Sequence, residues 1–108
     1  MNKIFLATLV PVALLIQTPH AMAEDGMALA KKSGCLACHA LDKTIVGPAW
    51  NDVAEKYKND PEAHTKLVQS VLTGSSGKWG SKVHMKAQNQ VPQEDVSKLV
   101  DYILSLKK

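Results

Sequence analysis

Hydrophobic positions recur with helical spacing over much of the chain after about residue 25. The first stripe, at i, i+3, i+4 and i+7, consists of Trp50, Val53, Ala54 and Tyr57. A second, in a helix predicted over 62–73, consists of Ala63, Leu67, Val68, Val71 and Leu72. A third, in a helix from 92 or 93 to 106, consists of Val96, Leu99, Val100, Ile103 and Leu106. No strand-like alternation or repeat stands out, so the pattern predicts an all-α domain.

Capping residues and breakers give the expected element boundaries. A short helix is predicted over 25–33, because Asp25 can cap its start and Gly34 can end it. Asp60 is the expected cap of the 62–73 helix, with Pro61 at its first position. Residues 40–49 read as a loop broken by Gly-Pro. Residues 74–86, which contain three glycines, read as a long loop of the kind that often carries function.

The first 23 residues have the layout of a secretory signal peptide. A short basic start, Met1–Lys3, precedes an apolar run from Ile4 to Ile16, and Ala21-Met22-Ala23 fits a cleavage site. The run is too short to span a bilayer comfortably, although an uncleaved membrane anchor is the alternative. We therefore expect a cleaved signal peptide over 1–23, a functional domain over 24–108 and a periplasmic location.

The chemistry concentrates in Cys35-Leu36-Ala37-Cys38-His39, which has the C-x-x-C-H form of a covalent haem attachment site. The two thiols are spaced to reach the two vinyl groups of one porphyrin, and the histidine then lies beneath the iron. A redox dithiol, a structural disulfide or half of a zinc site are the alternatives. The adjacent histidine, the lack of any other cysteine and the export signal favour haem.

Charge adds little. Once Lys3 leaves with the signal peptide, twelve lysines face ten acidic residues, and the chain has no arginine. Scattered lysines and few aromatic residues argue against a nucleic-acid partner. Lysines such as Lys43, Lys78, Lys82 and Lys86 either surround a docking edge for acidic redox partners or simply solvate the surface. Both readings stay open.

The residue opposite His39 decides what a haem does here, since a strong sixth ligand favours electron transfer over ligand binding. Met85, in the long loop and far from His39 in sequence, is the favoured ligand, with His84, Lys82 and Lys86 as rivals. Met27 is expected in the core and His64 on a solvated helix face. The second ring nitrogen of His39 needs an acceptor, and the carbonyl of Pro48 is the candidate.

The ordered motifs resemble those of the small bacterial class I cytochromes c of the c-551/c-552 type. The residues that carry the resemblance are 32–39 (KSGCLACH), 46–50 (VGPAW), 74–80 (GSSGKWG), Met85 and 99–104 (LVDYIL). The resemblance implies the class I cytochrome c fold, with three to four short helices wrapped around one covalently attached haem c. It also implies that the first and last helices cross, with Gly26 or Ala30 close to Tyr102.

The same resemblance implies roles for individual residues. Cys35 and Cys38 would form the thioethers, and His39 and Met85 would be the axial iron ligands. The Pro48 carbonyl would stand behind His39, and Trp79 near a haem propionate. Two departures are visible. The prolines that usually flank the distal methionine are missing from Val83–Ala87, and the spacing from Trp79 to Met85 is one residue longer. Replacement of Met85 by His84 or a lysine is therefore more plausible than usual.

The expected function is that of a periplasmic, monomeric, single-haem electron carrier rather than an enzyme. Its expected partners are an upstream electron donor and a terminal reductase or oxidase, with no membrane insertion after signal cleavage. One rival is a small haem protein whose labile distal ligand permits ligand binding or peroxidase-type chemistry. A diheme peroxidase would need a second C-x-x-C-H, which the sequence lacks. The other rival is a thiol–disulfide protein using Cys35 and Cys38.

Overall fold

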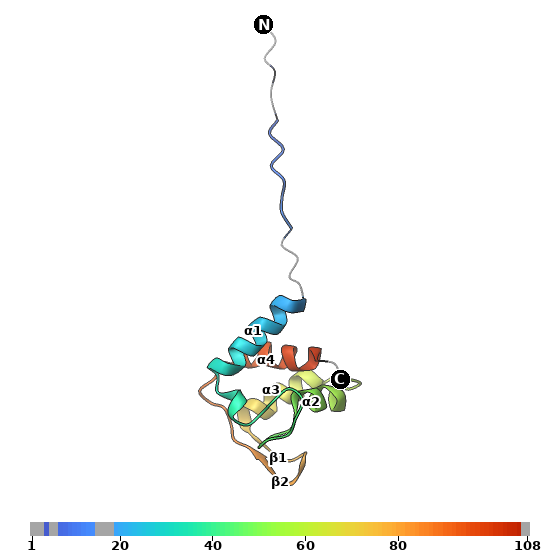
Figure 1. The fold of residues 1–108 in the computed structure, drawn as a ribbon, viewed down its shortest axis with the longest axis vertical. Coiled ribbons are helices and arrows are strands. Elements are labelled where there is room, and N and C mark those ends of the chain that lie inside the picture. The colour runs from blue at the N-terminus through green and yellow to red at the C-terminus, as the bar shows by residue number, and fades with distance from the viewer. Residues whose placement is uncertain (1–3, 5–6, 15–18, 107–108) are drawn as a thin grey trace.

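The computed structural model describes residues 4, 7–14 and 19–106. Its elements are α1 (Pro19–Lys32), a 3₁₀ turn η1 (Cys35–Ala37), α2 (Trp50–Tyr57), α3 (Ala63–Thr73), β1 (Ser75–Gly77), β2 (Gly80–Met85) and α4 (Gln93–Ser105) (Figure 1). The prediction of a mainly helical domain is confirmed. The basic start of the proposed signal peptide, Met1–Lys3, and the terminal Lys107 and Lys108 lie outside the described residues.

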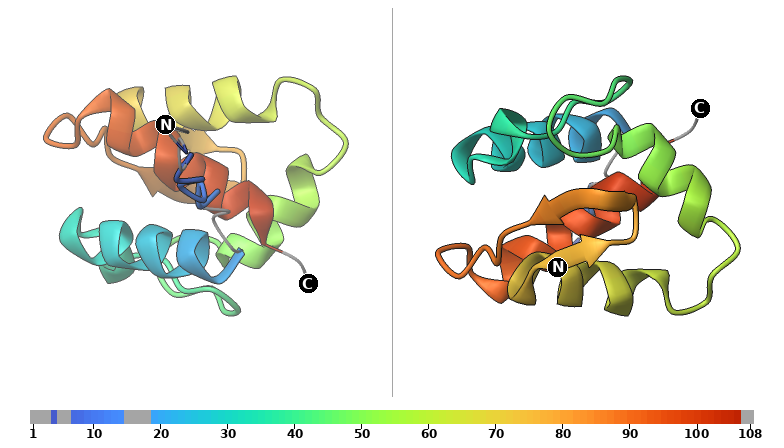
Figure 2. Two further views of the ribbon diagram at one scale, coloured as in Figure 1. Left: turned by 90° about the horizontal axis from the view of Figure 1, so that it is seen from above. Right: turned by 90° about the horizontal axis from the view of Figure 1, so that it is seen from below.

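Helix α4 is the element on which the others pack. It contacts α1, α2 and α3, and the two views in Figure 2 show these three helices arranged around it. Its buried residues are Val96, Leu99, Val100, Tyr102 and Ile103. Four of these were predicted from the apolar stripe. All four stripe residues of α2 are likewise buried. On α3, Ala63 is buried and the other four apolar stripe residues are half-buried.

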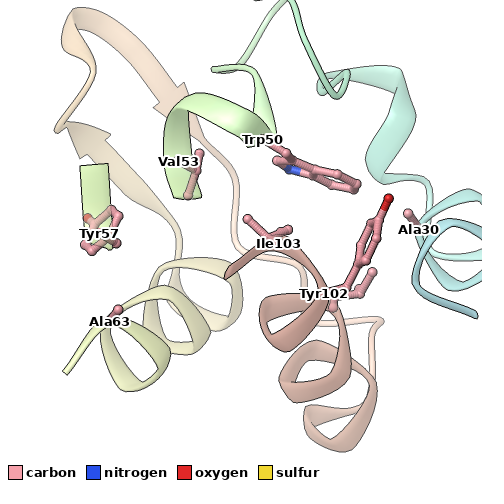
Figure 3. Close-up of a cluster of buried hydrophobic side chains, with 8 residues drawn as sticks. Ala30, Trp50, Val53, Tyr57, Ala63, Tyr102 and Ile103 are labelled. Carbon is pink, nitrogen blue, oxygen red and sulfur yellow. The ribbon is translucent and has the colours of Figure 1, made fainter. Parts of the chain in front are cut away.

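The main buried cluster joins α1, α2, α3 and α4. Figure 3 shows Tyr102 of α4 beneath the indole of Trp50 and directed toward Ala30 of α1. The Trp50 and Tyr102 rings meet edge to face, with centroids 6.2 Å apart and planes at 90°. This is a favoured aromatic geometry, because the positive edge of one ring meets the negative face of the other. Burial also raises the pKa of the Tyr102 hydroxyl.

Helices α1 and α4 cross at very close range (Figure 1), as the resemblance to the small class I cytochromes c implied. A Cβ atom added at Gly26 would overlap the Tyr102 ring, so only hydrogen at this position leaves room for the aromatic side chain. Ala30, one turn further along α1, is fully buried in the same cluster. Tyr102 therefore packs against the backbone of α1 at Gly26 rather than against a side chain.

Helix α1 begins earlier than the sequence predicted. It starts at Pro19, so Asp25 lies inside the helix and cannot cap it, which corrects the expected start at Asp25. Proline is well suited to the first helical position, and the alanines that follow favour continuation. The predicted cleavage site at 21–23 is thus part of this helix. Within the described ranges, none of the helices has both the length and the apolar character needed to cross a bilayer.

The start of α3 also differs from the prediction. The helix begins at Ala63, and Asp60 instead forms a tight turn before it by accepting the Glu62 N–H at 2.9 Å. The Lys66 ammonium donates to the other oxygen of Asp60 at 2.7 Å. This hydrogen bond, together with that from the Glu62 N–H, lowers the pKa of the Asp60 carboxyl. Asp60 therefore organises the entry to α3 without being its N-cap.

The expectation of a strand-free chain is wrong, because residues 75–85 form a small antiparallel hairpin. Ser75 pairs with Met85 and Ser76 with His84, followed by an irregularity between Ser76 and Gly77. Strand β1 has only three residues, Ser-Ser-Gly, and both strands are largely exposed. Strand β1 contains no apolar residue, and in β2 the alternation is limited to Val83 and Met85, which is too short to stand out as a strand signal. The turn depends on Gly77 and Gly80, which have φ values of 78° and 123°.

We expect Gly26→Ala to destabilise the protein, although alanine is ordinarily the better helix former. The added methyl group must push Tyr102 away from α1, which should cost about 1–3 kcal/mol of unfolding free energy. Guanidinium unfolding of the haem-containing protein would measure the change. Ala28→Ser, at an exposed position of α1, is the control and should stay within about 0.5 kcal/mol of the parent. A stabilised Gly26→Ala variant would contradict the close crossing.

Candidate haem-binding site

A cavity of about 290 Å³ lies between the segment that follows α1 and the elements α3, β1 and β2. Its wall is mainly apolar and draws residues from every helix except α1, as well as from the hairpin. Figure 2 shows the two sides of the molecule that enclose it, with η1 and the 40–49 loop on one side and α3 on the other. Cys35, Cys38, His39, Pro48, Trp79 and Met85 all line this cavity. The structure thus brings together every site residue predicted from the sequence.

The two cysteines reach the cavity because the chain turns sharply after α1. Gly34 ends the helix with a φ of 77°, and the N–H groups of Cys38 and His39 both donate to the Cys35 carbonyl, at 3.2 and 3.1 Å. Cys35 is half-buried and Cys38 is exposed, and both thiols are free. This tight turn presents two thiols and an imidazole from five consecutive residues.

The environment of Cys35 argues against a redox dithiol. Burial raises the pKa of the Cys35 thiol, and the neighbouring Cys38 raises it further. Reactive C-x-x-C pairs depend on a thiol whose pKa is lowered, because the thiolate is the nucleophile. In the described part of the chain, no cluster of three or more His, Cys, Asp or Glu side chains is placed to hold a metal ion.

The imidazole of His39 is fixed by three neighbours. Its Nδ1 lies 2.8 Å from the carbonyl oxygen of Pro48. Because a carbonyl can only accept, Nδ1 carries the proton and Nε2 keeps its lone pair. The Trp50 ring stacks on the imidazole, with centroids 5.6 Å apart and planes inclined by 26°. On another side the ring rests against Gly47, where an added Cβ would come within 2.7 Å of His39 Cε1.

Across the cavity, Met85 ends strand β2 and is held by its pairing with Ser75. Its side chain is half-buried and lines the cavity, as do the exposed His84 and Lys86. The His84 Nδ1 lies 3.0 Å from the Ser76 hydroxyl on the facing strand. Met85, His84 and Lys86 therefore share this wall of the cavity, and His84 is hydrogen-bonded within the hairpin through its Nδ1.

Other residues considered from the sequence lie elsewhere. The His64 side chain extends from α3 to α4, where its Nε2 is 3.1 Å from Ser97 Oγ and 3.2 Å from Asp101 Oδ1. Met27 is half-buried on α1. Lys43 and Lys82 are exposed. None of these four residues lines the cavity.

Sequence reasoning missed three residues of the wall. Gly47 was quoted only as part of a resemblance, whereas the structure shows that its missing side chain makes room for His39. Ser70 follows Leu67 at helical spacing on the inner side of α3, so a polar residue within the apolar stripe was the available signal. Lys78 is exposed, as expected for a surface lysine, and its ammonium also donates to Ser70 Oγ at 3.0 Å, a contact that the sequence did not indicate.

The fit of these residues to haem c can be judged from the wall itself. An apolar cavity suits a porphyrin plate, and two free thiols lie at one end. The bond to the Pro48 carbonyl selects the tautomer of the neutral imidazole whose proton is on Nδ1, which leaves the Nε2 lone pair for an iron. Histidine and methionine are the axial pair of electron-transfer cytochromes c. The residues present therefore fit the group.

Comparisons with known proteins agree. The family model for cytochrome c matches residues 23–107. Cytochrome c-551 of Allochromatium vinosum is 46% identical over 88 residues, covering 82% of this chain and 90% of that protein. Cytochrome c-552 of Nitrosomonas europaea is 38% identical over 107 residues, covering 99% of this chain and all of that protein.

The fold is similar as well. The crystal structure of wild-type Nitrosomonas europaea cytochrome c552 superposes with a TM-score of 0.72 at 42% identity, covering 75% of this chain and 99% of that one. Members of this family bind haem c covalently, and Cys35 and Cys38 fit its attachment motif. Their small c-551 and c-552 representatives are electron carriers. On its sequence, its fold and its attachment motif, the chain belongs to the cytochrome c family.

Proposed function

We propose that this protein is an exported single-haem electron carrier that passes one electron at a time between respiratory redox proteins. The observation that carries the proposal is the shared cavity, which has both cysteines and His39 on one side and Met85 on the other. When bound, haem c supplies an iron that alternates between the ferric and ferrous states. The rest of the task, holding the group and fixing its ligands, falls to the residues of this chain.

In this proposal the thiols of Cys35 and Cys38 would hold the haem by adding across its two vinyl groups, and Nε2 of His39 would bind the iron. The contacts of His39 with Pro48, Trp50 and Gly47 keep the imidazole in one orientation. A ligand that does not move between redox states keeps the structural change on electron transfer small. The hydrogen bond from Nδ1 to the Pro48 carbonyl also raises the electron density of the ring, so Nε2 becomes a stronger ligand for iron.

Met85 is the proposed distal ligand. The prolines that usually stiffen this segment are missing, but the backbone pairing of Met85 with Ser75 supplies an alternative restraint. His84 bonds to Ser76 through Nδ1, which leaves its Nε2 free, so this bond does not exclude it as a ligand. Neighbouring residues of a strand point to opposite faces, and Met85 is half-buried whereas His84 is exposed, which favours the thioether as sixth ligand. A retained sixth ligand in turn favours electron transfer over ligand binding or peroxidase-type chemistry, which is the alternative function.

The proposed route for electrons is the edge of the haem at Cys38. Cys38 is exposed, and the nearby loop residues Ile45 and Val46 are 46% and 64% exposed. Exposed apolar residues around a cofactor edge suit brief contacts with a redox protein. The proposal also includes the signal peptide over 1–23, a periplasmic location and a monomeric state. Lys43, Lys82 and Lys86 are exposed and could guide acidic partners.

Mass spectrometry of the protein from the periplasm tests processing and attachment together. We expect a chain beginning at Glu24 with about 616 daltons added, the mass of one haem. Cys35→Ala together with Cys38→Ala should abolish the addition, because no other cysteine exists in the sequence. A full-length chain would contradict cleavage. A chain without added haem and about 2 daltons lighter than the dithiol, the mass of two hydrogens lost in a disulfide, would support the thiol–disulfide alternative.

The ultraviolet–visible spectrum of the ferric protein tests Met85. A weak far-red band arises from sulfur bound to ferric iron, so we expect this band in the parent and its loss in Met85→Ala. The reduced Met85→Ala protein should also bind carbon monoxide rapidly, whereas the parent should resist it. His84→Ala is the matched control and should keep the band. If His84→Ala alone changed the spectrum, the distal ligand would be His84.

Gly47→Ala tests the restraint on His39. The added methyl group would press on the imidazole, so we expect a weakened bond to Pro48 and a loss of about 1–3 kcal/mol of unfolding free energy. Nuclear magnetic resonance of the reduced protein would follow the His39 Nδ1 proton, whose exchange with solvent should accelerate. Ala37→Ser, at an exposed position of η1, is the control. Unchanged exchange in Gly47→Ala would argue against the close contact.

A further inference from the structure

Ser70 is the one polar residue in the buried core of the described chain, with 9% of its surface exposed. It lies on the side of α3 that faces the cavity. Its hydroxyl donates to the Lys66 carbonyl one turn earlier, at 3.0 Å. That leaves the oxygen free to accept, and it accepts from the Lys78 ammonium at 3.0 Å. A buried serine thus holds a cation at the cavity wall.

Lys78 reaches this position from the turn of the hairpin. Its own carbonyl accepts a hydrogen bond from the Lys56 ammonium at 2.7 Å, and that ammonium lies 4.3 Å from the centre of the Trp79 ring. Both lysines are therefore tied to the hairpin turn, and Lys78 and Trp79 both line the cavity. The turn is fixed to α2 on one side and to α3 on the other.

No carboxylate balances the Lys78 charge in the described part of the chain. The ion pairs between lysines and carboxylates of the described residues join Lys66 to Asp60 at 2.7 Å, Lys58 to Glu55 at 2.6 Å and Lys98 to Glu94 at 3.4 Å, and none includes Lys78. The partner of the ammonium is the neutral Ser70 hydroxyl. Lys78 is an exposed residue, but its ammonium is held at a mainly apolar wall without a counter-charge, where it can bind an anion that enters the cavity.

Haem provides a suitable anion. Its two propionate carboxylates lie on the porphyrin edge opposite the vinyl carbons to which cysteines attach. The cysteines belong to η1 and the residue that follows it, whereas Ser70 belongs to α3, on the other side of the molecule (Figure 2). Attachment at Cys35 and Cys38 would therefore direct the carboxylates away from η1, toward the wall that contains Ser70 and Lys78.

We propose that Lys78, positioned by the Ser70 hydroxyl, binds a propionate carboxylate of the haem as an ion pair. This inference rests on the haem placement of the proposed function. Its chemical consequence is that the bound carboxylate stays ionised across neutral pH, because a cation within hydrogen-bond reach favours the charged form. Ser70 is a positioning residue, since it acts through Lys78 and not on the haem itself.

The test compares Lys78→Met with the parent, both as haem-containing proteins. The ¹³C signals of the propionate carboxyl carbons would be followed by nuclear magnetic resonance between about pH 5 and 8, a range that covers carboxyl groups in apolar sites. We expect no titration of the bound carboxylate in the parent and a clear titration in Lys78→Met. Without the cation, burial disfavours the ionised form and raises the carboxyl pKa.

The reduction potential is the second measurement. When the unpaired carboxylate of Lys78→Met loses its proton, the new negative charge stabilises ferric iron, so the potential should fall as pH rises through that titration. Above it, Lys78→Met has one positive charge fewer beside the haem than the parent. Its ratio of reduced to oxidised protein at a fixed applied potential should therefore be lower by roughly threefold or more. The parent should show no step in this range.

Three further variants separate the ion pair from a general charge effect. Lys82→Met removes an exposed hairpin lysine that does not line the cavity, and it should leave the carboxyl signals unchanged. Lys78→Arg keeps the charge and should restore the parent behaviour. Ser70→Ala keeps every charge but frees the ammonium, so a smaller titration in the same direction is expected.

Identical carboxyl titrations in the parent, Lys78→Met and Ser70→Ala would overturn the inference. If Lys78→Met yields no haem protein, Ser70→Ala decides alone, and a parent-like titration would reject the proposal. The far-red sulfur band distinguishes this failure from failure of the proposed function. The band should persist in all four variants, because none alters His39 or Met85.

Discussion

The hydrogen bond from His39 Nδ1 to the Pro48 carbonyl is the contact on which the site depends. It joins the end of the attachment motif to a loop nine residues later, and the short N–H···O contact from Gly47 to Cys38, at 2.7 Å, runs beside it. Together they fold the 40–49 segment back on the motif, which delivers Trp50 to the far face of the imidazole. The Pro48 carbonyl can only accept a hydrogen bond, so it selects the His39 tautomer whose proton is on Nδ1.

A continuous series of aromatic contacts connects this histidine to the helix crossing. His39 stacks on Trp50, Trp50 meets the edge of Tyr102, and Tyr102 packs on the backbone at Gly26. The rings are rigid and buried, so displacement of one is felt by the next. The packing of the first and last helices is therefore coupled to the orientation of the imidazole, although α1 contributes no residue to the cavity wall.

Local patterns predicted the parts of the fold that depend on neighbouring residues. The stripe of α2 was correct at every position, because residues spaced by a helical turn share one face whatever lies opposite. The start of α1 at Pro19 was missed because a signal peptide was expected to end shortly after it. The hairpin was missed because its stability comes from backbone pairing and glycine turns, which leave no hydrophobic period in Ser75–Gly77.

The site was predictable to a similar degree. A five-residue motif is local, so Cys35, Cys38 and His39 could be read directly, and a proline that follows closely is a natural acceptor. The contact between Lys78 and Ser70 depends on how the hairpin packs on α3, so it could not be predicted from the identity of either residue. His64 is a second example, since its contacts with Ser97 and Asp101 depend on the packing of α3 on α4.

The buried residues fall into two clusters, one around Trp50, Leu99 and Tyr102 and the other around Val91, Val96 and Val100. Leu67 and Leu104, both only partly buried, touch both clusters, and residues of the two clusters line the cavity. In a domain this small, neither cluster buries much apolar surface alone. The porphyrin therefore serves as the missing centre of a divided core, and its attachment is also a maturation step. A bound porphyrin would add apolar contacts between the two clusters beyond those that Leu67 and Leu104 already make.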